Sequence, residues 1–224
     1  MQVKRRWAEL TIQNDPFFVD PEFEQLNFDF IGSLDWPSNP VFVDVGGHQG
    51  IWATFLALLR PAGLVYTFEP HPNNVNYLLG NLRSTGIGNV LVAPVGLSSV
   101  DGPATLRCWD ASRKAGATGN HQFTVGDLPH YEIAARTRRL DAYGLGRLDF
   151  IKIDVEHWEL EVLKGAVETL TRCKPWLLIE THDDKLVEPL KELLEPLGYT
   201  CERQKILSVP SLNLHSDYLW CVLS

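Results

Sequence analysis

VFVDVGGHQG, residues 41–50, is the stretch that decides the fold. An apolar run from Val41 to Val45 passes into a glycine-rich turn, and apolar residues at helical spacing follow from Ile51 to Leu59. A continuous apolar run is typical of a strand that is buried on both faces of a parallel sheet. The stretch therefore predicts the first strand, loop and helix of an open α/β sheet, whose ligands bind at the carboxyl ends of the strands.

The glycine loop differs from the dinucleotide-binding fingerprint. The pattern G-x-G-x-x-G would need a glycine at Val45, whereas the chain has D-x-G-x-x-x-G beginning at Asp44. A carboxylate repels a pyrophosphate but pairs with an ammonium group, so we expect a ligand with an amino-acid moiety. A tight turn with a helix-capping aspartate is the alternative. The loop residues expected to border the ligand are Gly46, Gly47, His48 and Gly50.

An acidic residue ends the second predicted strand, which runs over 64–68. Glu69 stands about 25 residues after Asp44, near the spacing at which an acid binds ribose hydroxyls in nucleotide-binding sheets. We therefore expect Glu69 to hold a ribose, with an ordinary exposed strand-end glutamate as the alternative. Gly96 comes directly after the third predicted strand at 90–95, and we expect it to border the cofactor as well.

Two later strands end in a group of carboxylates and a histidine. Asp154 closes a predicted buried strand at 150–154, and Glu156 shares its face if the strand continues. Glu180 and His182 follow the next predicted strand. Because parallel strands bring their carboxyl ends to one edge of a sheet, we expect these side chains to converge.

Three roles remain open for this group. One is a general base toward an acceptor hydroxyl, for which His182 and Glu156 are the candidates, with Asp154 beside them. Another is ligation of Mg²⁺ by Asp154 and Glu180, because magnesium prefers carboxylate oxygens. The third is hydrogen bonding to substrate or cofactor. The aspartates at 183–184 precede a predicted helix and are expected to cap it.

Strands and helices alternate along most of the chain. The remaining predicted helices lie at 73–84, 160–170 and 185–197, and the remaining strands of the main sheet lie at 176–179, 200–207 and 218–222. The last two strands have no helix between them and predict an antiparallel hairpin at a sheet edge. The whole pattern predicts an α/β, Rossmann-like sheet of about seven mostly parallel strands, with one antiparallel strand and helices on both faces.

Two segments depart from this alternation. Strands predicted at 104–109 and 131–140 flank a polar loop and form a strand-loop-strand insertion at about 104–140. Residues 1–40 are irregular, with several prolines and phenylalanines, and aromatic surface of that extent is expected to pack on the main domain. We interpret 1–40 as an N-terminal lid or wrap on a single domain formed by 41–224.

The composition indicates a globular chain of 224 residues, 45% of them hydrophobic, without an apolar run long enough to span a membrane. Acidic residues outnumber basic ones by 28 to 20, which argues against a nucleic-acid partner, because such partners usually require a basic surface. Residues 1–10 lack the apolar segment of a signal peptide. No CxxC spacing occurs, so reduced thiols and a cytoplasmic location are expected. The four cysteines are Cys108, Cys173, Cys201 and Cys221.

Four motifs together resemble the FkbM family of S-adenosylmethionine-dependent methyltransferases. They are VFVDVGGHQG at 41–50, VYTFEPHPNNVNYLLGNL at 65–82, FIKIDVEHWELEVLKGAVETL at 150–170 and PWLLIETH at 175–182. The resemblance implies a class I methyltransferase fold, S-adenosyl-L-methionine as cofactor, and methylation of hydroxyl groups on natural products, sugars or polysaccharides. The positions it implies are Asp44, Gly46 and Gly50 at the methionine part of the cofactor, Glu69 at its ribose, and Asp154 and Glu156 beside the site of methyl transfer.

The chain departs from the family pattern at two places. Gly47 and His48 stand where the family commonly has a small residue and asparagine. His157, followed by Trp158, stands where the family commonly has glycine after Ile-Asp-Val-Glu. A bulky pair at that position is expected to reshape the acceptor pocket.

The sequence thus predicts a methyltransferase that acts on a hydroxyl of a small molecule or sugar. His182 or Glu156 is expected to accept the hydroxyl proton, with a divalent ion at Asp154 and Glu180 as a further option. The loop at 110–129 and the N-terminal segment are expected to cover the acceptor. The alternatives are a nucleic-acid methyltransferase on the same fold and a non-catalytic nucleotide-binding module, while the missing glycine fingerprint disfavours a dehydrogenase. Oligomeric state is left open.

Overall fold

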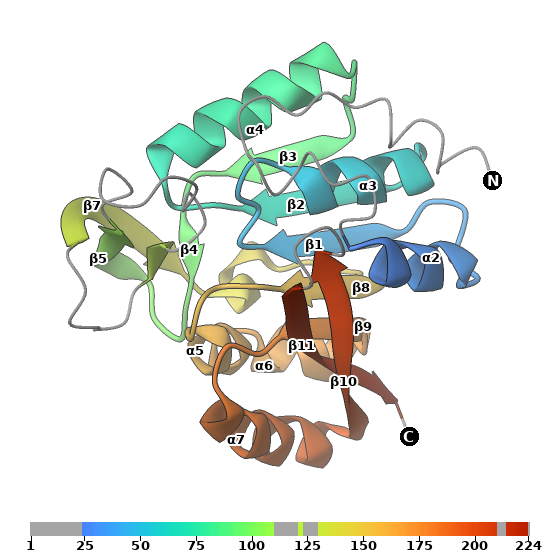
Figure 1. The fold of residues 1–224 in the computed structure, drawn as a ribbon. Helices are drawn as coiled ribbons and strands as arrows, with labels where there is room; N and C mark the ends of the chain where they lie inside the picture. Colours follow the sequence, from blue (N-terminus) through green and yellow to red (C-terminus); the bar gives the residue numbers. More distant parts are fainter. Residues whose placement is uncertain (1–23, 110–120, 123–129, 210–213, 224) are drawn as a thin grey trace.

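A computed structural model of the chain describes residues 24–109, 121–122, 130–209 and 214–223 (Figure 1). Its main feature is a seven-stranded sheet in the order β10-β11-β9-β8-β1-β2-β3. Five neighbouring strands run parallel, and β11 is antiparallel to both β9 and β10. The strands are β1 (Val41–Val45), β2 (Leu64–Phe68), β3 (Val90–Ala93), β8 (Phe150–Ile153), β9 (Trp176–Glu180), β10 (Tyr199–Val209) and β11 (Leu214–Leu223). The predicted Rossmann-like architecture with one antiparallel strand is confirmed.

Helices cover both faces of this sheet, because successive strand residues point to opposite sides. Phe42 and Phe150 belong to a buried cluster with α2 and α3, whereas Val43 and Ile151 belong to a second cluster with α5, α6 and α7. No helix among the described residues has both the length and the apolar character needed to cross a bilayer. The helices are α2 (Gln25–Ser33), α3 (Ile51–Leu59), α4 (Pro72–Ser84), α5 (Glu159–Lys164), α6 (Val167–Cys173) and α7 (Asp184–Leu194), with short 3₁₀ turns η3 (Leu140–Tyr143) and η4 (Glu195–Leu197).

Two helical segments differ from the prediction. The segment expected to be irregular contains α2, whose Phe28 and Ile31 are buried in the core, and only the part from residue 24 onward is described. The helix predicted over 160–170 is divided into α5 and α6 at Gly165. The main chain of Ser98 passes so close to Gly165 that a Cβ atom there would overlap its carbonyl oxygen.

A smaller sheet contains the predicted insertion. Its order is β4-β7-β5-β6, and β5 and β7 pair as antiparallel neighbours from Gly102–Thr137 to Trp109–His130. The strands are β4 (Gly96–Leu97), β5 (Gly102–Trp109), β6 (His121–Gln122) and β7 (His130–Arg138). Of the loop between β5 and β7, only β6 lies within the described residues, so the role predicted for 110–129 stays a prediction.

The cysteines correct one expectation. The antiparallel register of β10 and β11 places Cys201 opposite Cys221, and a disulfide joins them. The prediction of reduced thiols is therefore wrong for this pair, while Cys108 and Cys173 are free. The pairing of Cys201 with Cys221 depends on the register of the hairpin, which the spacing of cysteines in the sequence does not reveal. The cytoplasmic location inferred from reduced thiols stays a prediction.

Candidate active site

The glycine loop is held against the ends of β8 and β2. A Cβ atom on Gly46, which has φ +84°, would overlap the main-chain oxygen of Asp154, and one on Gly47 would overlap Oγ1 of Thr67. The glycines therefore serve the close packing of the chain itself, in addition to any role toward a ligand. Gly50 precedes α3 as its N-cap. The loop lies at the carboxyl end of the sheet, as predicted.

Asp44 is completely buried at the end of β1. Its Oδ2 accepts a hydrogen bond of 2.9 Å from Thr67 Oγ1, whereas Oδ1 has no hydrogen-bond partner among the described residues. Burial raises the pKa of Asp44 to about 6, although the Lys152 ammonium and the Thr67 hydrogen bond lower it. An unsatisfied buried carboxylate oxygen is costly, and it marks where a donor would be stabilising.

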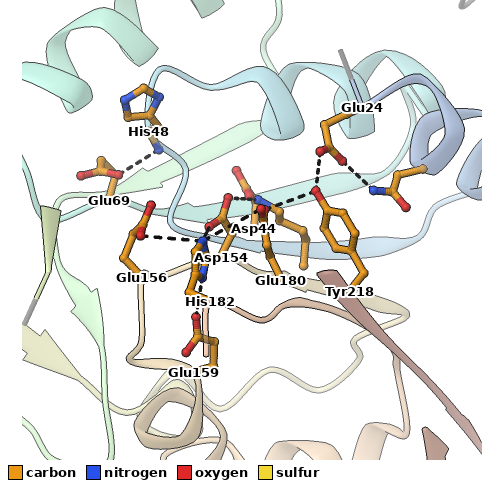
Figure 2. A network of polar contacts seen from close by, with 12 residues as sticks. Glu24, Asp44, His48, Glu69, Asp154, Glu156, Glu159, Glu180, His182 and Tyr218 are labelled. Atoms are coloured by element: carbon orange, nitrogen blue, oxygen red, sulfur yellow. Dashed lines mark hydrogen bonds and ion pairs between the residues drawn. The ribbon is translucent and has the colours of Figure 1, made fainter. Parts of the chain in front are cut away.

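Glu69 ties the loop to the end of β2 (Figure 2). Its Oε2 accepts the main-chain N–H of His48 at 2.8 Å, and its Oε1 accepts that of His71 at 2.8 Å. Burial raises the pKa of Glu69 to about 7 even though these hydrogen bonds lower it. The predicted proximity of the glycine loop and Glu69 is thus present, but Glu69 is buried instead of being an exposed strand-end residue. Asn74 Nδ2 also donates to Oε1 at 3.4 Å, so of the four lone-pair positions of the carboxylate one remains for a ligand hydroxyl.

The turn after β8 corrects the expected strand face. The strand ends at Ile153, and Glu156 and His157 have φ of +49° and +72°. Asp154 and Glu156 are therefore brought together by a tight turn and not by strand periodicity. His157 holds a left-handed conformation at a position where the family commonly has glycine, which adopts that region without steric cost. Strain of this kind concentrates at functional sites.

His182, which follows β9, lies at the centre of a group of carboxylates (Figure 2). Its Nδ1 is 2.9 Å from Oε1 of the buried Glu159. Its Nε2 is 3.6 Å from Asp154 Oδ1, 3.7 Å from Glu156 Oε2 and 4.0 Å from Glu180 Oε1. The predicted convergence of the two strand ends is therefore present.

The charge of this group bears on the role predicted for His182. Burial lowers the pKa of His182, but the hydrogen bond to Glu159 and the neighbouring carboxylates raise it to about 10. This pKa favours the protonated imidazole at neutral pH, a form that does not accept a proton, and the role of His182 as the base stays a prediction.

Lys152 is a site residue that sequence reasoning missed. It lies inside β8, its side chain is 2% exposed, and its Nζ donates to Asp154 Oδ2 at 2.7 Å. The ammonium also lies 5.3 Å from the centre of the Trp52 ring. Burial would raise the pKa of Asp154, but Lys152 and His182 bring it below its ordinary value. A lysine within a strand that is otherwise apolar was the signal available in the sequence.

Glu180 continues this network toward the N-terminal helix. The hydroxyl of Tyr218 lies 3.3 Å from Glu180 Oε2 and also donates to Oε1 of Glu24 (Figure 2). Burial raises the pKa of Glu180 to about 8, and the neighbouring charges of Asp154 and Glu24 add to the effect. Neither Tyr218 nor Glu24 was a candidate in the sequence.

The remaining predicted residues lie away from this group or have structural roles. Gly96 is buried in β4, where it pairs with Thr137, and its place beside a cofactor stays a prediction. Asp183 caps α7 by accepting the main-chain N–H of Lys185 at 2.9 Å, which confirms its expected role. Asp184 is the acidic first residue of that helix.

A possible cation site overlaps the same group. Among the described residues, Asp154, Glu180 and His182 form the one set of three or more ligand-type side chains whose atoms lie within 4.8 Å of one another. The Lys152 ammonium already contacts Asp154 there. Cationic side chains therefore compete with a metal ion for the same carboxylates.

The sequence and the fold were compared with those of known proteins. The family model of the methyltransferase FkbM domain matches residues 44–201. The 2-O-methyltransferase NoeI of Sinorhizobium fredii is 30% identical over 185 residues, which cover 75% of this chain and 74% of that protein. The hexuronic acid methyltransferase AglP of Haloferax volcanii is 25% identical over 179 residues, which cover 80% of this chain and 69% of that protein.

Among solved structures, the crystal structure of methyltransferase FkbM from Methylobacillus flagellatus superposes with a TM-score of 0.59 at 17% identity. The match covers 98% of this chain and 58% of that chain, so this chain spans little more than half of the solved relative. At this identity the superposition supports the fold alone, whereas the family model covers most of the sequence. The chain therefore belongs to the methyltransferase FkbM domain family and is an S-adenosylmethionine-dependent methyltransferase.

Proposed function

We propose that the chain transfers a methyl group from S-adenosylmethionine to a hydroxyl oxygen of a sugar or another small molecule. The observation that carries this proposal is the convergence of Asp154, Glu156 and His182 at the ends of β8 and β9, next to the glycine loop. The names of the relatives point the same way, since one is a 2-O-methyltransferase and another acts on hexuronic acid.

The acidic loop residues fit this cofactor. S-adenosylmethionine supplies an electrophilic methyl group on a sulfonium centre and carries a second positive charge on its ammonium group. The buried Asp44, with its unpaired Oδ1, and the loop at Gly46 and Gly50 would border the methionine part. Glu69 would accept hydrogen bonds from the ribose hydroxyls. Gly47, His48 and Gly96 would complete the surroundings of the cofactor.

Glu156 is the proposed proton acceptor. The acceptor oxygen would bond to the methyl carbon as the bond from that carbon to sulfur breaks, which leaves a neutral thioether, and the hydroxyl proton would pass to the Glu156 carboxylate. In this proposal His182 stays protonated, and its Nε2 lies 3.7 Å from Oε2 of Glu156. Nζ of Lys152 lies 2.7 Å from Oδ2 of Asp154, so each carboxylate is oriented by a cationic group. The role of these residues is mainly to align the hydroxyl for an in-line displacement.

A divalent ion is a second candidate for Asp154 and Glu180. Three ligand-type atoms within 4.8 Å favour it, whereas the Lys152 ammonium on Asp154 opposes it. We therefore favour Lys152 and His182, and not a metal ion, as the positive charges that neutralise these carboxylates. Activity that disappears with a chelator and returns with Mg²⁺ would favour the metal ion instead.

One contact joins the inserted sheet to the end of β2, where the cofactor ribose is proposed to bind. The hydroxyl of Tyr131, on β7, lies 3.3 Å from Nε2 of His71, which follows Glu69 at the end of β2. This contact supports the proposal that the insertion lies over the acceptor. The acidic net charge of −8 favours a neutral or small acceptor over a nucleic acid.

A methyl-transfer assay with radiolabelled S-adenosylmethionine tests the function. The acceptors are methyl glucoside, methyl glucuronoside, the 2-deoxy form of each, and a structured RNA. We expect label on a sugar with an intact 2-hydroxyl, and a loss of about a hundredfold in Glu156→Gln. Glu161→Gln, on the adjacent helix, is the matched control. Labelling of RNA alone, or full turnover in Glu156→Gln, would contradict the proposal.

A further inference from the structure

The N-terminal helix α2 begins beside the proposed methyl-transfer site. Phe28 of α2 stacks on Phe55 with ring centres 4.3 Å apart and meets Trp52 edge-on at 4.9 Å, so the helix is anchored on α3. Glu24, the N-cap residue, has a left-handed φ of +54° and a buried side chain. The packing of α2 therefore holds a carboxylate at a fixed place inside the protein.

Tyr218 of β11 joins this carboxylate to the site. Its side chain is completely buried, and its hydroxyl donates to Glu24 while it also lies 3.3 Å from Oε2 of Glu180. A phenol has one proton to donate, so Tyr218 can donate to Glu24 or to Glu180 but not to both at once. Asn27 Nδ2 donates to the other oxygen of Glu24 at 2.6 Å and fixes the far end.

This chain of buried polar groups is poorly explained by stability. Removing a carboxylate from water is unfavourable, and apolar residues of similar volume often replace buried charged groups without loss of stability. The apolar cluster around α2 and α3 would readily accept such residues. The network is better explained by what it does at its other end, where Glu180 lies 4.0 Å from His182 Nε2.

We propose that Tyr218 and Glu24 are positioning residues, which hold the Glu180 carboxyl away from His182 so that Glu156 and Asp154 keep their contacts with the imidazole. Helix α2 then helps to position the catalytic groups, although its N-cap residue Glu24 lies 194 residues from Tyr218 in the sequence. This inference rests on the proposed function, because it assigns the cluster around His182 to methyl transfer.

The test compares Tyr218→Phe with Tyr199→Phe. Tyr199 is also buried, but its hydroxyl has no hydrogen-bond partner among the described residues, so its removal controls for the loss of a buried phenol oxygen. We expect Tyr218→Phe to lower kcat by about tenfold to about a hundredfold on the best sugar of the panel, because small misplacements near the reacting groups are costly. The Kd of S-adenosylmethionine, measured by calorimetry, should stay within about twofold.

A second readout does not depend on turnover. The ring ¹⁵N signals of His182, assigned by their loss in His182→Gln, should move in Tyr218→Phe and in Glu24→Gln but not in Tyr199→Phe. Unmoved His182 signals, or a kcat that Tyr218→Phe leaves unchanged, would overturn the inference. So would a parallel loss of kcat, cofactor affinity and melting temperature, which indicates a structural role only.

The two proposals fail in different ways. If the wild-type protein binds S-adenosylmethionine but labels no acceptor of the panel, the proposed acceptor class is wrong. The His182 signals then decide the inference alone, since movement in Tyr218→Phe supports the positioning role and its absence overturns it.

Discussion

Oε1 of Glu159 accepts two hydrogen bonds, from Nδ1 of His182 at 2.9 Å and from the main-chain N–H of His157 at 3.1 Å. Glu159 is completely buried at the start of α5. One carboxylate thus fixes both the strained turn after β8 and the imidazole after β9. Because Nδ1 is engaged, Nε2 must face Asp154 and Glu156, and the orientation of the ring is set.

Glu159→Gln should weaken the electrostatic interaction between residue 159 and His182 without changing the size of the side chain. The amide keeps the size of the carboxyl but removes its charge, so the pKa of His182 should fall from about 10. We expect turnover to fall by about tenfold while cofactor affinity changes little. An NMR titration of His182 and steady-state kinetics measure the two effects. Glu161→Gln, two residues further along α5, should change neither, and an unaltered His182 titration in Glu159→Gln would refute the pairing.

His182 should also make stability depend on pH. Its folded-state pKa of about 10 is above the ordinary value of 6.5, so protonation favours the folded state. The contribution is present in full below about pH 6.5 and is lost as pH rises through about 10. The difference in unfolding free energy between the wild type and His182→Gln should therefore narrow across this range in urea titrations. If the difference in unfolding free energy instead grew with pH, the pKa of His182 would not be raised in the folded state.

Glu69 should make cofactor binding depend on pH near neutrality. Its pKa is about 7, and ribose hydroxyls donate to the ionised form, so affinity should rise between about pH 6 and about pH 8. Glu69→Gln should weaken binding by about tenfold and remove the pH dependence. Calorimetry with S-adenosylhomocysteine measures both. Glu188→Gln, at an exposed position on α7, is the control, and a retained pH dependence in Glu69→Gln would exclude the assignment.

Two glycines offer a matched pair of alanine substitutions. Gly46→Ala should destabilise the protein by about 3 kcal/mol or more, because the residue has φ +84° and its Cβ would overlap the Asp154 main chain. Gly80→Ala, inside α4 with open space around it, should stabilise by about 0.5–1 kcal/mol. Urea unfolding measures both. Similar effects at the two positions would show that the loop lacks this conformation.

The disulfide between Cys201 and Cys221 can be counted chemically. Denatured, unreduced protein should show two reactive thiols, those of Cys108 and Cys173, and four after reduction. Replacing both Cys201 and Cys221 by serine should lower the unfolding free energy by about 3 kcal/mol, given a loop of 20 residues. Four thiols before reduction would contradict the disulfide.

Local patterns predicted the sheet and the strand-end carboxylates because each depends on residues close in sequence. The buried strands read as apolar runs, and parallel pairing of β8 with β9 brings Asp154 and His182 together without further information. The strand face assigned to Glu156 was wrong, since nothing in Val155-Glu156-His157 indicates two successive left-handed residues.

Long-range partners could not be read from the sequence. Tyr218 becomes part of the site only through its place opposite Glu180 in the register of β11 and β9, and Glu24 only through the packing of α2. The pairing of Cys201 with Cys221 likewise depends on hairpin register. Lys152 is different, because a lysine between isoleucines in a buried strand already demands a counter-ion.

The position of β11 between β9 and β10 has a consequence for biosynthesis. The ribosome completes β9 and β10 before it makes the strand that separates them, so one edge of β9 stays unpaired until β11 has been synthesised. Open edges of this kind are sites of aggregation and of wrong pairing, here with β10 in the place of β11. Nascent chains that stall after β10 should therefore be strong clients of chaperones that bind exposed strands.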